Sequence, residues 1–98
     1  MNVDVKNENG CVVLSPTDKI DFVSAPDFEK IIEAQAGSAD RMIIDMGQVE
    51  YISSAGLRAI LFADDLMSEK SGLVLRNVGN SVKEILDISG FSNVIKIE

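Results

Sequence analysis

The sequence predicts a single α/β domain over residues 1–98, with helices packed on a mixed, largely parallel sheet. Three observations lead to this fold class. Short apolar runs alternate with longer segments that begin at helix N-cap signals, and a hairpin signal stands near the start of the chain. The length of 98 residues and a hydrophobic content of 46% are enough for one core. The predicted element order is ββαβαβαβ, with right-handed crossovers.

The first two strands are predicted to form a β-hairpin. Val3-Asp4-Val5 alternates between apolar and polar residues, Asn9-Gly10 is a dipeptide of tight hairpin turns, and Cys11–Leu14 is apolar. We therefore expect this hairpin to supply an antiparallel edge to the sheet.

Three further strands are predicted. Arg41–Met46 is a short apolar run, typical of a central strand that is covered on both faces, and a loop is expected between it and Ser53. Leu73–Leu75 and Val94–Ile97 are predicted as the remaining strands.

The first predicted helix has Ser24 as its N-cap, Pro26 in its first turn and Asp27 at the capping-box position, and Gly37 ends it. Its predicted buried residues are Phe28, Ile31 and Ile32.

The second predicted helix runs from about Ser54 to Lys70. The third begins with a capping box, Ser81 to Glu84, and ends at Gly90. Its predicted buried residues are Val82, Ile85 and Leu86.

The amino-acid composition argues against several classes of function. Nine basic and sixteen acidic side chains give a formal net charge of −7, which argues against nucleic-acid binding and favours attraction to a basic protein partner. The chain has no histidine, so Ser-His-Asp and Cys-His catalysis are excluded. With Cys11 as the one cysteine, a structural zinc site and an intramolecular disulfide are excluded too. We expect no catalytic residues, metal or cofactor.

The sequence shows no signal-peptide pattern and no apolar run of the roughly 18 residues that a membrane span needs. We therefore expect a cytoplasmic monomer that does not insert into a membrane.

The N-terminus of the second helix is the candidate site. The first and third helices are predicted to carry Asp27 and Glu84 in their first turns, whereas Ala55–Arg58 contains no carboxylate. Helix N-termini favour anions, so a phosphate on the neighbouring Ser54 would find backbone N–H donors there. The alternative is that Ser53 or Ser54 only caps the helix.

Gly56 has two interpretations. Glycine costs roughly 1 kcal/mol relative to alanine inside a helix, so its presence indicates close approach by another backbone or by a partner. The alternative is tight packing of the helix on the sheet.

A helical wheel at about 100° per residue divides the second helix into two faces. The face expected to pack on the sheet contains Ala59, Ile60, Ala63 and Met67. The opposite face contains Ser54, Leu57, Arg58, Leu61, Asp65 and Ser68. Two leucines among charges beside a phosphorylatable serine indicate a partner-binding patch, and the alternative is that either leucine lies under a neighbouring loop.

The segment Tyr51-Ile52-Ser53-Ser54-Ala55-Gly56-Leu57-Arg58 resembles the signature of STAS domains, in particular the anti-sigma factor antagonists of bacteria. The resemblance extends over nearly the whole chain. Ile20-Asp21 followed by Ala25 resembles the family's segment before its first helix, Arg41–Asp45 its central strand, and Val82–Phe91 its third helix.

The resemblance implies a phosphorylation switch in bacterial transcription regulation. The unphosphorylated antagonist binds an anti-sigma factor that is also a serine kinase, which frees the sigma factor. The kinase then phosphorylates the serine at the start of helix two, the complex dissociates, and a serine phosphatase resets the cycle.

Ser54 corresponds to the phosphorylated serine, and Ser53 is the second candidate. Ser53 stands where well-studied members carry aspartate. Asp21 corresponds to an acidic residue near the serine, or is simply a turn residue. The predicted partner-binding residues are Asp21, Ser53, Gly56, Leu57, Arg58, Leu61 and Asp65.

Two other functions are open. One is a STAS domain that does not switch, acting as a scaffold or subunit of a stress-signalling, lipid-transport or transporter complex. The other is a small-ligand or nucleotide-binding α/β protein, although the sequence has no glycine-rich phosphate loop.

Overall fold

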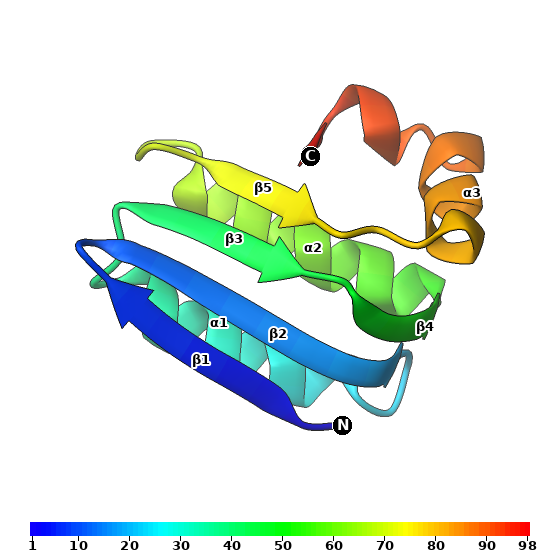
Figure 1. The fold of residues 1–98 in the computed structure, drawn as a ribbon, viewed down its shortest axis with the longest axis horizontal. Helices are drawn as coiled ribbons and strands as arrows, with labels where there is room; N and C mark the ends of the chain where they lie inside the picture. Colours follow the sequence, from blue (N-terminus) through cyan, green and yellow to red (C-terminus); the bar gives the residue numbers. More distant parts are fainter.

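The computed structural model describes all residues, 1–98, and places one six-stranded sheet in front of two long helices (Figure 1). The strands are β1 (Val3–Glu8), β2 (Cys11–Ile20), β3 (Arg41–Asp45), β4 (Gln48–Ile52), β5 (Leu73–Arg76) and β6 (Lys96–Ile97). The helices are α1 (Ala25–Ala36), α2 (Ser54–Met67) and α3 (Asn80–Ile88), with a short 3-10 helix at Phe91–Asn93.

The sheet has the predicted mixed, mostly parallel character. Its main path is β1-β2-β3-β5-β6, in which only β1 and β2 are antiparallel. Asn9 and Gly10 form the hairpin turn with φ angles of 52° and 83°, values that asparagine and glycine tolerate better than other residues. The predicted antiparallel edge is therefore confirmed.

The predicted loop before Ser53 is wrong, because that segment contains strand β4. The second half of β2 leaves β3 and pairs in parallel with β4, from Thr17 opposite Gln48 to Ile20 opposite Ile52. The register shifts between Asp18 and Lys19, so simple alternation along β4 is lost. The segment therefore lacks the period-two alternation by which a strand is predicted from sequence.

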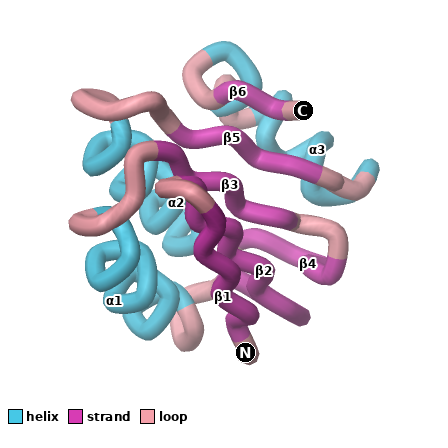
Figure 2. Tube along the Cα trace, turned by 60° about the vertical axis from the view of Figure 1, so that its left-hand side comes forward, coloured by secondary structure: helices cyan, strands magenta, loops and turns pink.

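The two long helices lie side by side on one face of the sheet, and α3 lies at its end beside β4 (Figures 1 and 2). The expectation that Arg41–Met46 is covered by elements on both faces is therefore wrong. On the other face of the sheet, which the two long helices do not cover, Ile43 and Val74 are nevertheless buried. Arg41 and Arg76 on this face both lie within ion-pair distance of Glu98, at 3.8 and 3.6 Å.

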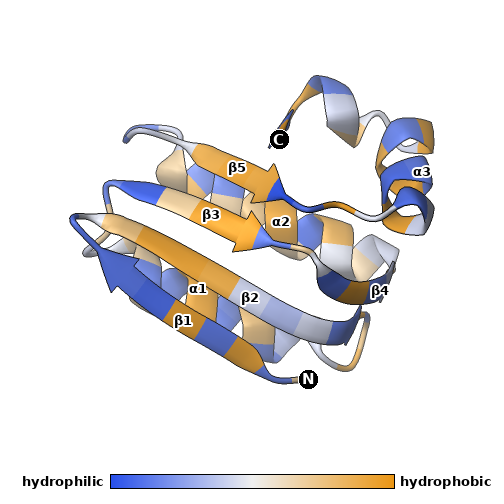
Figure 3. Cartoon of the chain, in the orientation of Figure 1, coloured by the Kyte–Doolittle hydropathy of each residue, from blue (hydrophilic) through white to orange (hydrophobic).

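The core lies between the sheet and the two long helices. The central strands β3 and β5 are largely apolar, whereas the edge strand β1 alternates (Figure 3). The largest fully buried side chains are Leu14, Ile20, Phe28, Ile32, Met42, Ile44, Met46, Ile52, Ile60, Met67, Leu75 and Leu86. Ile31, predicted as buried, is only partly so.

Helix ends were predicted less well than helix positions. Gly37 is the C-cap of α1 as predicted, but α2 ends at Met67 rather than Lys70. The capping box from Ser81 to Glu84 is wrong, because α3 begins at Asn80 after an extended Gly79. The last strand is limited to Lys96–Ile97, since the chain before it forms a 3-10 turn.

The C-terminal end of α1 has no basic residue of its own in the last turn. Lys70 supplies the charge from a distant loop, because its Nζ donates to the carbonyl oxygens of Ala36 at 2.5 Å and Ala39 at 2.8 Å. An ammonium at this position satisfies carbonyl groups that the helix leaves unpaired and complements the helix dipole. Lys70 therefore ties the end of α2 to the end of α1.

Candidate functional site

Ser53 and Ser54 have different roles at the start of α2. Ser53 is the N-cap in an extended conformation, and its Oγ accepts a hydrogen bond from the Gly56 backbone N–H at 3.4 Å. Its own N–H donates to the Ile20 carbonyl oxygen at 3.0 Å, which fixes the cap to the end of β2. Ser54 is the first helical residue, is exposed, and makes no side-chain hydrogen bond within the chain. The capping role thus belongs to Ser53, and the Ser54 hydroxyl is free.

The first turn of α2 contains no acidic residue, as predicted. The contrast holds with α1, which carries Asp27 in its first turn, but not with α3, because the actual start of that helix leaves Glu84 outside the first turn. The vacant anion position is therefore a feature that α2 shares with α3, whose first turn also contains an exposed serine, Ser81, without a side-chain hydrogen bond. What distinguishes α2 is the Ser53 cap directly before its free serine.

Gly56 is buried and serves the packing of α2 on β2 and β4. A Cβ atom at this position would lie 2.3 Å from the Ile20 carbonyl oxygen and 2.6 Å from Cγ1 of Ile52. These distances are too short for any side chain, so only glycine lets the helix start approach the sheet this closely. The structure supports the packing interpretation of Gly56 rather than direct approach by a partner.

Asp21 organises the turn between β2 and α1. Its Oδ1 accepts hydrogen bonds from the backbone N–H groups of Val23 at 3.0 Å and Ser24 at 3.1 Å. The Ser24 hydroxyl, predicted to cap α1, instead accepts from the Asp21 N–H at 3.0 Å and donates to the Lys19 carbonyl oxygen at 2.7 Å. The hydrogen bond from the Ser24 backbone is the main cause that lowers the pKa of the Asp21 carboxyl. Asp21 is therefore a turn residue that lies beside the Ser53 cap.

Replacing Asp21 with asparagine should remove a pH-dependent part of the stability. Because the pKa of the carboxyl is lower in the folded state than the ordinary value of 3.8, ionised Asp21 stabilises the fold above that pH. The stabilisation is lost as the pH falls through the lowered pKa. Urea unfolding of wild type and Asp21→Asn should therefore show a stability gap at pH 6 that narrows progressively as the pH falls below the ordinary value of 3.8. A gap that stays constant over this range would contradict the assigned role.

The two faces of α2 lie as the helical wheel predicts. The residues predicted to face the sheet are all buried: Ala59, Ile60, Ala63 and Met67. On the other face Arg58 and Asp65 are exposed and Leu61 is 38% exposed, whereas Leu57 is half-buried and packs against the core. Asp65 lies eleven residues beyond Ser54, about 16 Å along the helix at 1.5 Å per residue, so it is remote from the serine.

Sequence reasoning missed three exposed apolar residues near Ser54. Phe22 and Val23, in the turn that Asp21 organises, are 80% and 82% exposed, and Tyr51 of β4 is 47% exposed. The signal was present as an apolar pair directly after Asp21, but exposure is decided by the tertiary structure.

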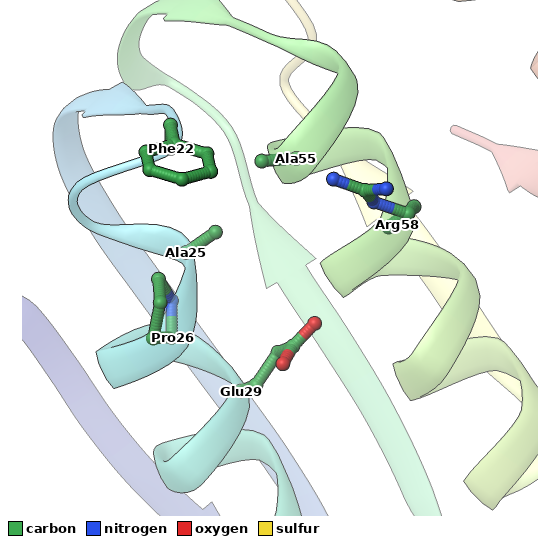
Figure 4. Close-up of a pocket in the computed structure, with 6 residues that line it drawn as sticks. All are labelled: Phe22, Ala25, Pro26, Glu29, Ala55 and Arg58. Carbon is green, nitrogen blue, oxygen red and sulfur yellow. The ribbon is translucent and has the colours of Figure 1, made fainter.

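A hollow of about 350 Å³ opens between the N-terminal ends of α1 and α2 (Figure 4). It is lined by Phe22, Ala25, Pro26, Glu29, Ala55 and Arg58. Figure 4 shows the charged ends of Glu29 and Arg58 reaching into it from the two facing helices. The hollow therefore begins directly beside the first turn of α2.

The remaining features offer little chemistry. No three acidic or cysteine side chains gather in a way that could hold a metal ion. None of the helices is long and apolar enough to cross a membrane. What this end of the molecule presents is a free serine hydroxyl, a helix N-terminus and an exposed apolar turn.

Comparison with known proteins gives a consistent result. The family model described as STAS domain matches residues 2–98. The chain is 29% identical to the putative anti-sigma factor antagonist BtrV of Bordetella bronchiseptica, over 99% of this chain and 85% of that protein. It is also 29% identical to the anti-sigma-B factor antagonist of Bacillus subtilis, over 99% of this chain and 90% of that protein. The structure resembles an anti-sigma factor antagonist from Mycobacterium paratuberculosis, with a TM-score of 0.89 and 25% identity over 98% of this chain and 83% of that one.

Proposed function

The chain belongs to the STAS domain family, and on that basis we propose that it is an anti-sigma factor antagonist controlled by phosphorylation of Ser54. The unphosphorylated protein binds an anti-sigma factor that is also a serine kinase, and so releases the sigma factor. Phosphorylation of Ser54 ends the interaction, and a serine phosphatase restores it. The protein acts in the bacterial cytoplasm as a binding module rather than as an enzyme.

The observation that carries this proposal is the free hydroxyl of Ser54 at the exposed start of α2. A kinase can reach this hydroxyl without unfolding any part of the domain. The neighbouring serine cannot be modified as easily, because the Ser53 Oγ is engaged in the cap and Ser53 is partly buried. The names of the relatives from Bordetella bronchiseptica and Bacillus subtilis support the class of partner.

Release after phosphorylation has a simple electrostatic reason. A kinase holds the phosphates of its nucleotide opposite the acceptor hydroxyl, so a phosphate on Ser54 faces negative charge in the kinase site. The helix N-terminus stabilises the same phosphate in the free domain. Phosphorylation therefore favours the dissociated state.

Phosphorylation should depend on Ser54 and not on Ser53. Incubated with ATP and a purified anti-sigma kinase from the source genome, the wild-type protein should gain one phosphate by mass spectrometry. Ser54→Ala should gain none. Ser53→Ala should still be phosphorylated, although it loses about 0.5–2 kcal/mol of stability with its cap.

Undiminished phosphorylation of Ser54→Ala would overturn the assignment of the acceptor. The same mass measurement on protein from native cells distinguishes the switch from a STAS domain that serves only as a scaffold, since a scaffold subunit should carry no phosphate on Ser54.

A further inference from the structure

Strand β1 leaves one edge of the sheet unpaired. It begins the main path of the sheet, pairs with β2 on one side only, and all its residues except Val3 are exposed. The strand at the other end of that path, β6, has only two residues. An edge strand of six residues presents a row of backbone N–H and C=O groups to which another strand can pair. β1 is therefore the edge at which a further strand can join this sheet.

The register of the hairpin determines which backbone groups of β1 face outward. Opposite residues in an antiparallel ladder alternate between pairs that hydrogen-bond to each other and pairs that do not. The Asn2 carbonyl oxygen accepts from the Thr17 N–H at 3.0 Å, and the register continues without a shift to Glu8 opposite Cys11. The even-numbered residues of β1 therefore bond to β2. The odd-numbered residues direct their N–H and C=O groups to the unpaired edge: Val3, Val5 and Asn7.

The side chains of β1 divide between the two faces of the sheet. Val5 lies opposite Leu14, which is buried in the core, and Asn7 donates from its Nδ2 to the Gln35 Oε1 of α1 at 3.2 Å. The odd-numbered side chains therefore lie on the helix side. The other face receives three exposed charges from β1: Asp4, Lys6 and Glu8. Charges on an edge strand ordinarily prevent pairing between two copies, but these alternate in sign, so their effect depends on the register.

Two antiparallel registers overlap most of β1 in two copies and keep the outward-facing residues opposite each other. One aligns Val3–Asn7 with Asn7–Val3 of the second copy, and the other aligns Asp4–Glu8 with Glu8–Asp4. In the second register Lys6 meets Lys6 and Asp4 meets Glu8, so like charges lie opposite each other. In the first register Asp4 of each copy meets Lys6 of the other, so both contacts join opposite charges. Charge complementarity therefore selects the first register.

We propose that two copies of this chain pair edge to edge through β1, antiparallel and about a two-fold axis at Val5, so that their sheets become continuous. A two-fold interface must be complementary to itself, and this register meets that condition. The outward N–H and C=O groups of Val5 bond to those of its equivalent. The Val5 side chain, 36% exposed in one copy, is covered by the same residue of the second copy. Asp4 and Lys6 form two symmetric ion pairs on the other face.

This dimer leaves the phosphorylation site accessible. β2 lies between β1 and β4, the strand that leads into Ser54 (Figure 1). Pairing through β1 therefore leaves Ser54 exposed in both copies, and the inference is independent of the proposed function. A dimer departs from the monomer expected from the sequence, because the pattern of residues does not show which strand lies at an edge.

The test is sedimentation velocity of the purified protein without any partner. An interface built on one strand pair is small, so the concentration is varied from about 10 μM to about 1 mM. The wild-type protein should pass from monomer to dimer over this range. Lys6→Asp should raise the dimer Kd at least about tenfold, because it places two carboxylates opposite each other twice. Combining Lys6→Asp with Asp4→Lys exchanges the charges, and should return the Kd to within about twofold of wild type.

Two further variants separate backbone pairing from net charge. Val5→Pro removes the N–H at the two-fold axis but no bond to β2, so it should abolish the dimer while the domain stays folded by thermal melting. Lys96→Asp makes the same charge change as Lys6→Asp, at an exposed position of β6, and should leave the Kd within about twofold of wild type.

A wild-type protein that stays monomeric up to about 1 mM would overturn the proposal and leave the β1 edge to a strand of a different protein. A dimer unchanged by Val5→Pro or by Lys6→Asp would place the interface elsewhere. An equal loss in Lys96→Asp would reduce the effect to net charge, and a charge exchange that restores nothing would exclude this register. Each of these results contradicts pairing through β1 and leaves the assignment of Ser54 untouched.

Discussion

Ile60→Glu should unfold the domain, whereas Leu61→Glu, one residue further along α2, should leave it folded. Ile60 is fully buried between α2 and the sheet, so a glutamate there would put an unpaired charge in the core. The cost of several kcal/mol is comparable to the whole stability of a domain of this size, about 5–15 kcal/mol. Leu61 is 38% exposed and can be replaced without opening the core.

Comparison of Ile60→Glu with Leu61→Glu separates an effect on folding from an effect on partner binding. Leu61 lies two turns beyond Ser54 on the same face of α2, within the patch predicted to contact the partner. If Leu61 is an apolar contact at the interface centre, Leu61→Glu should cost about 2 kcal/mol or more of binding free energy. Thermal melting of both variants, beside a binding assay with the kinase, decides the outcome. A Leu61→Glu variant that melts as badly as Ile60→Glu would show that Leu61 belongs to the core.

The faces of α2 could be predicted from the sequence because the helix packs on the sheet along one straight stripe. A period of 3.6 residues then separates Ile60 and Met67 from Arg58 and Leu61 without any knowledge of the neighbouring elements. The same holds for the hairpin, since Asn9-Gly10 determines its turn locally.

Other features could not be predicted because they depend on distant residues. Strand β4 exists through its pairing with β2, thirty-one or thirty-two residues earlier, and the bulge at Asp18 and Lys19 breaks its alternation. The role of Gly56 depends on the Ile20 carbonyl in the same way. The start of α3 at Asn80 shows a different limit, because the capping-box pattern from Ser81 to Glu84 is present in the sequence but the helix already begins one residue before it, after Gly79.

The two serines of the candidate site were predicted from the sequence, whereas the exposed apolar residues beside them were not. Ser53 and Ser54 follow from the helix signal and the family resemblance, but the structure was needed to assign the cap to one and the free hydroxyl to the other. Phe22 and Val23 were missed because apolar residues in a turn are ordinarily assumed to be buried.

Ser54→Asp should weaken kinase binding strongly while leaving the domain as stable as wild type or more stable. A carboxylate at the N-terminus of α2 occupies the vacant anion position, which is favourable by about 0.3–1 kcal/mol. At the interface the same charge is desolvated without a partner and faces the nucleotide phosphates, so binding should lose about 2 kcal/mol or more, roughly thirtyfold. A variant that unfolds, or that binds as tightly as wild type, is inconsistent with the switch.

The most direct measurement is the affinity of the ADP-loaded anti-sigma kinase for two forms of the wild-type protein, one unphosphorylated and one quantitatively phosphorylated on Ser54. The proposed mechanism predicts tight binding of the first form and, for the second, an affinity at least thirtyfold lower by the same estimate, about 2 kcal/mol, with treatment by a serine phosphatase restoring the original value. Equal affinity of the two forms would contradict the claim that Ser54 is the switch.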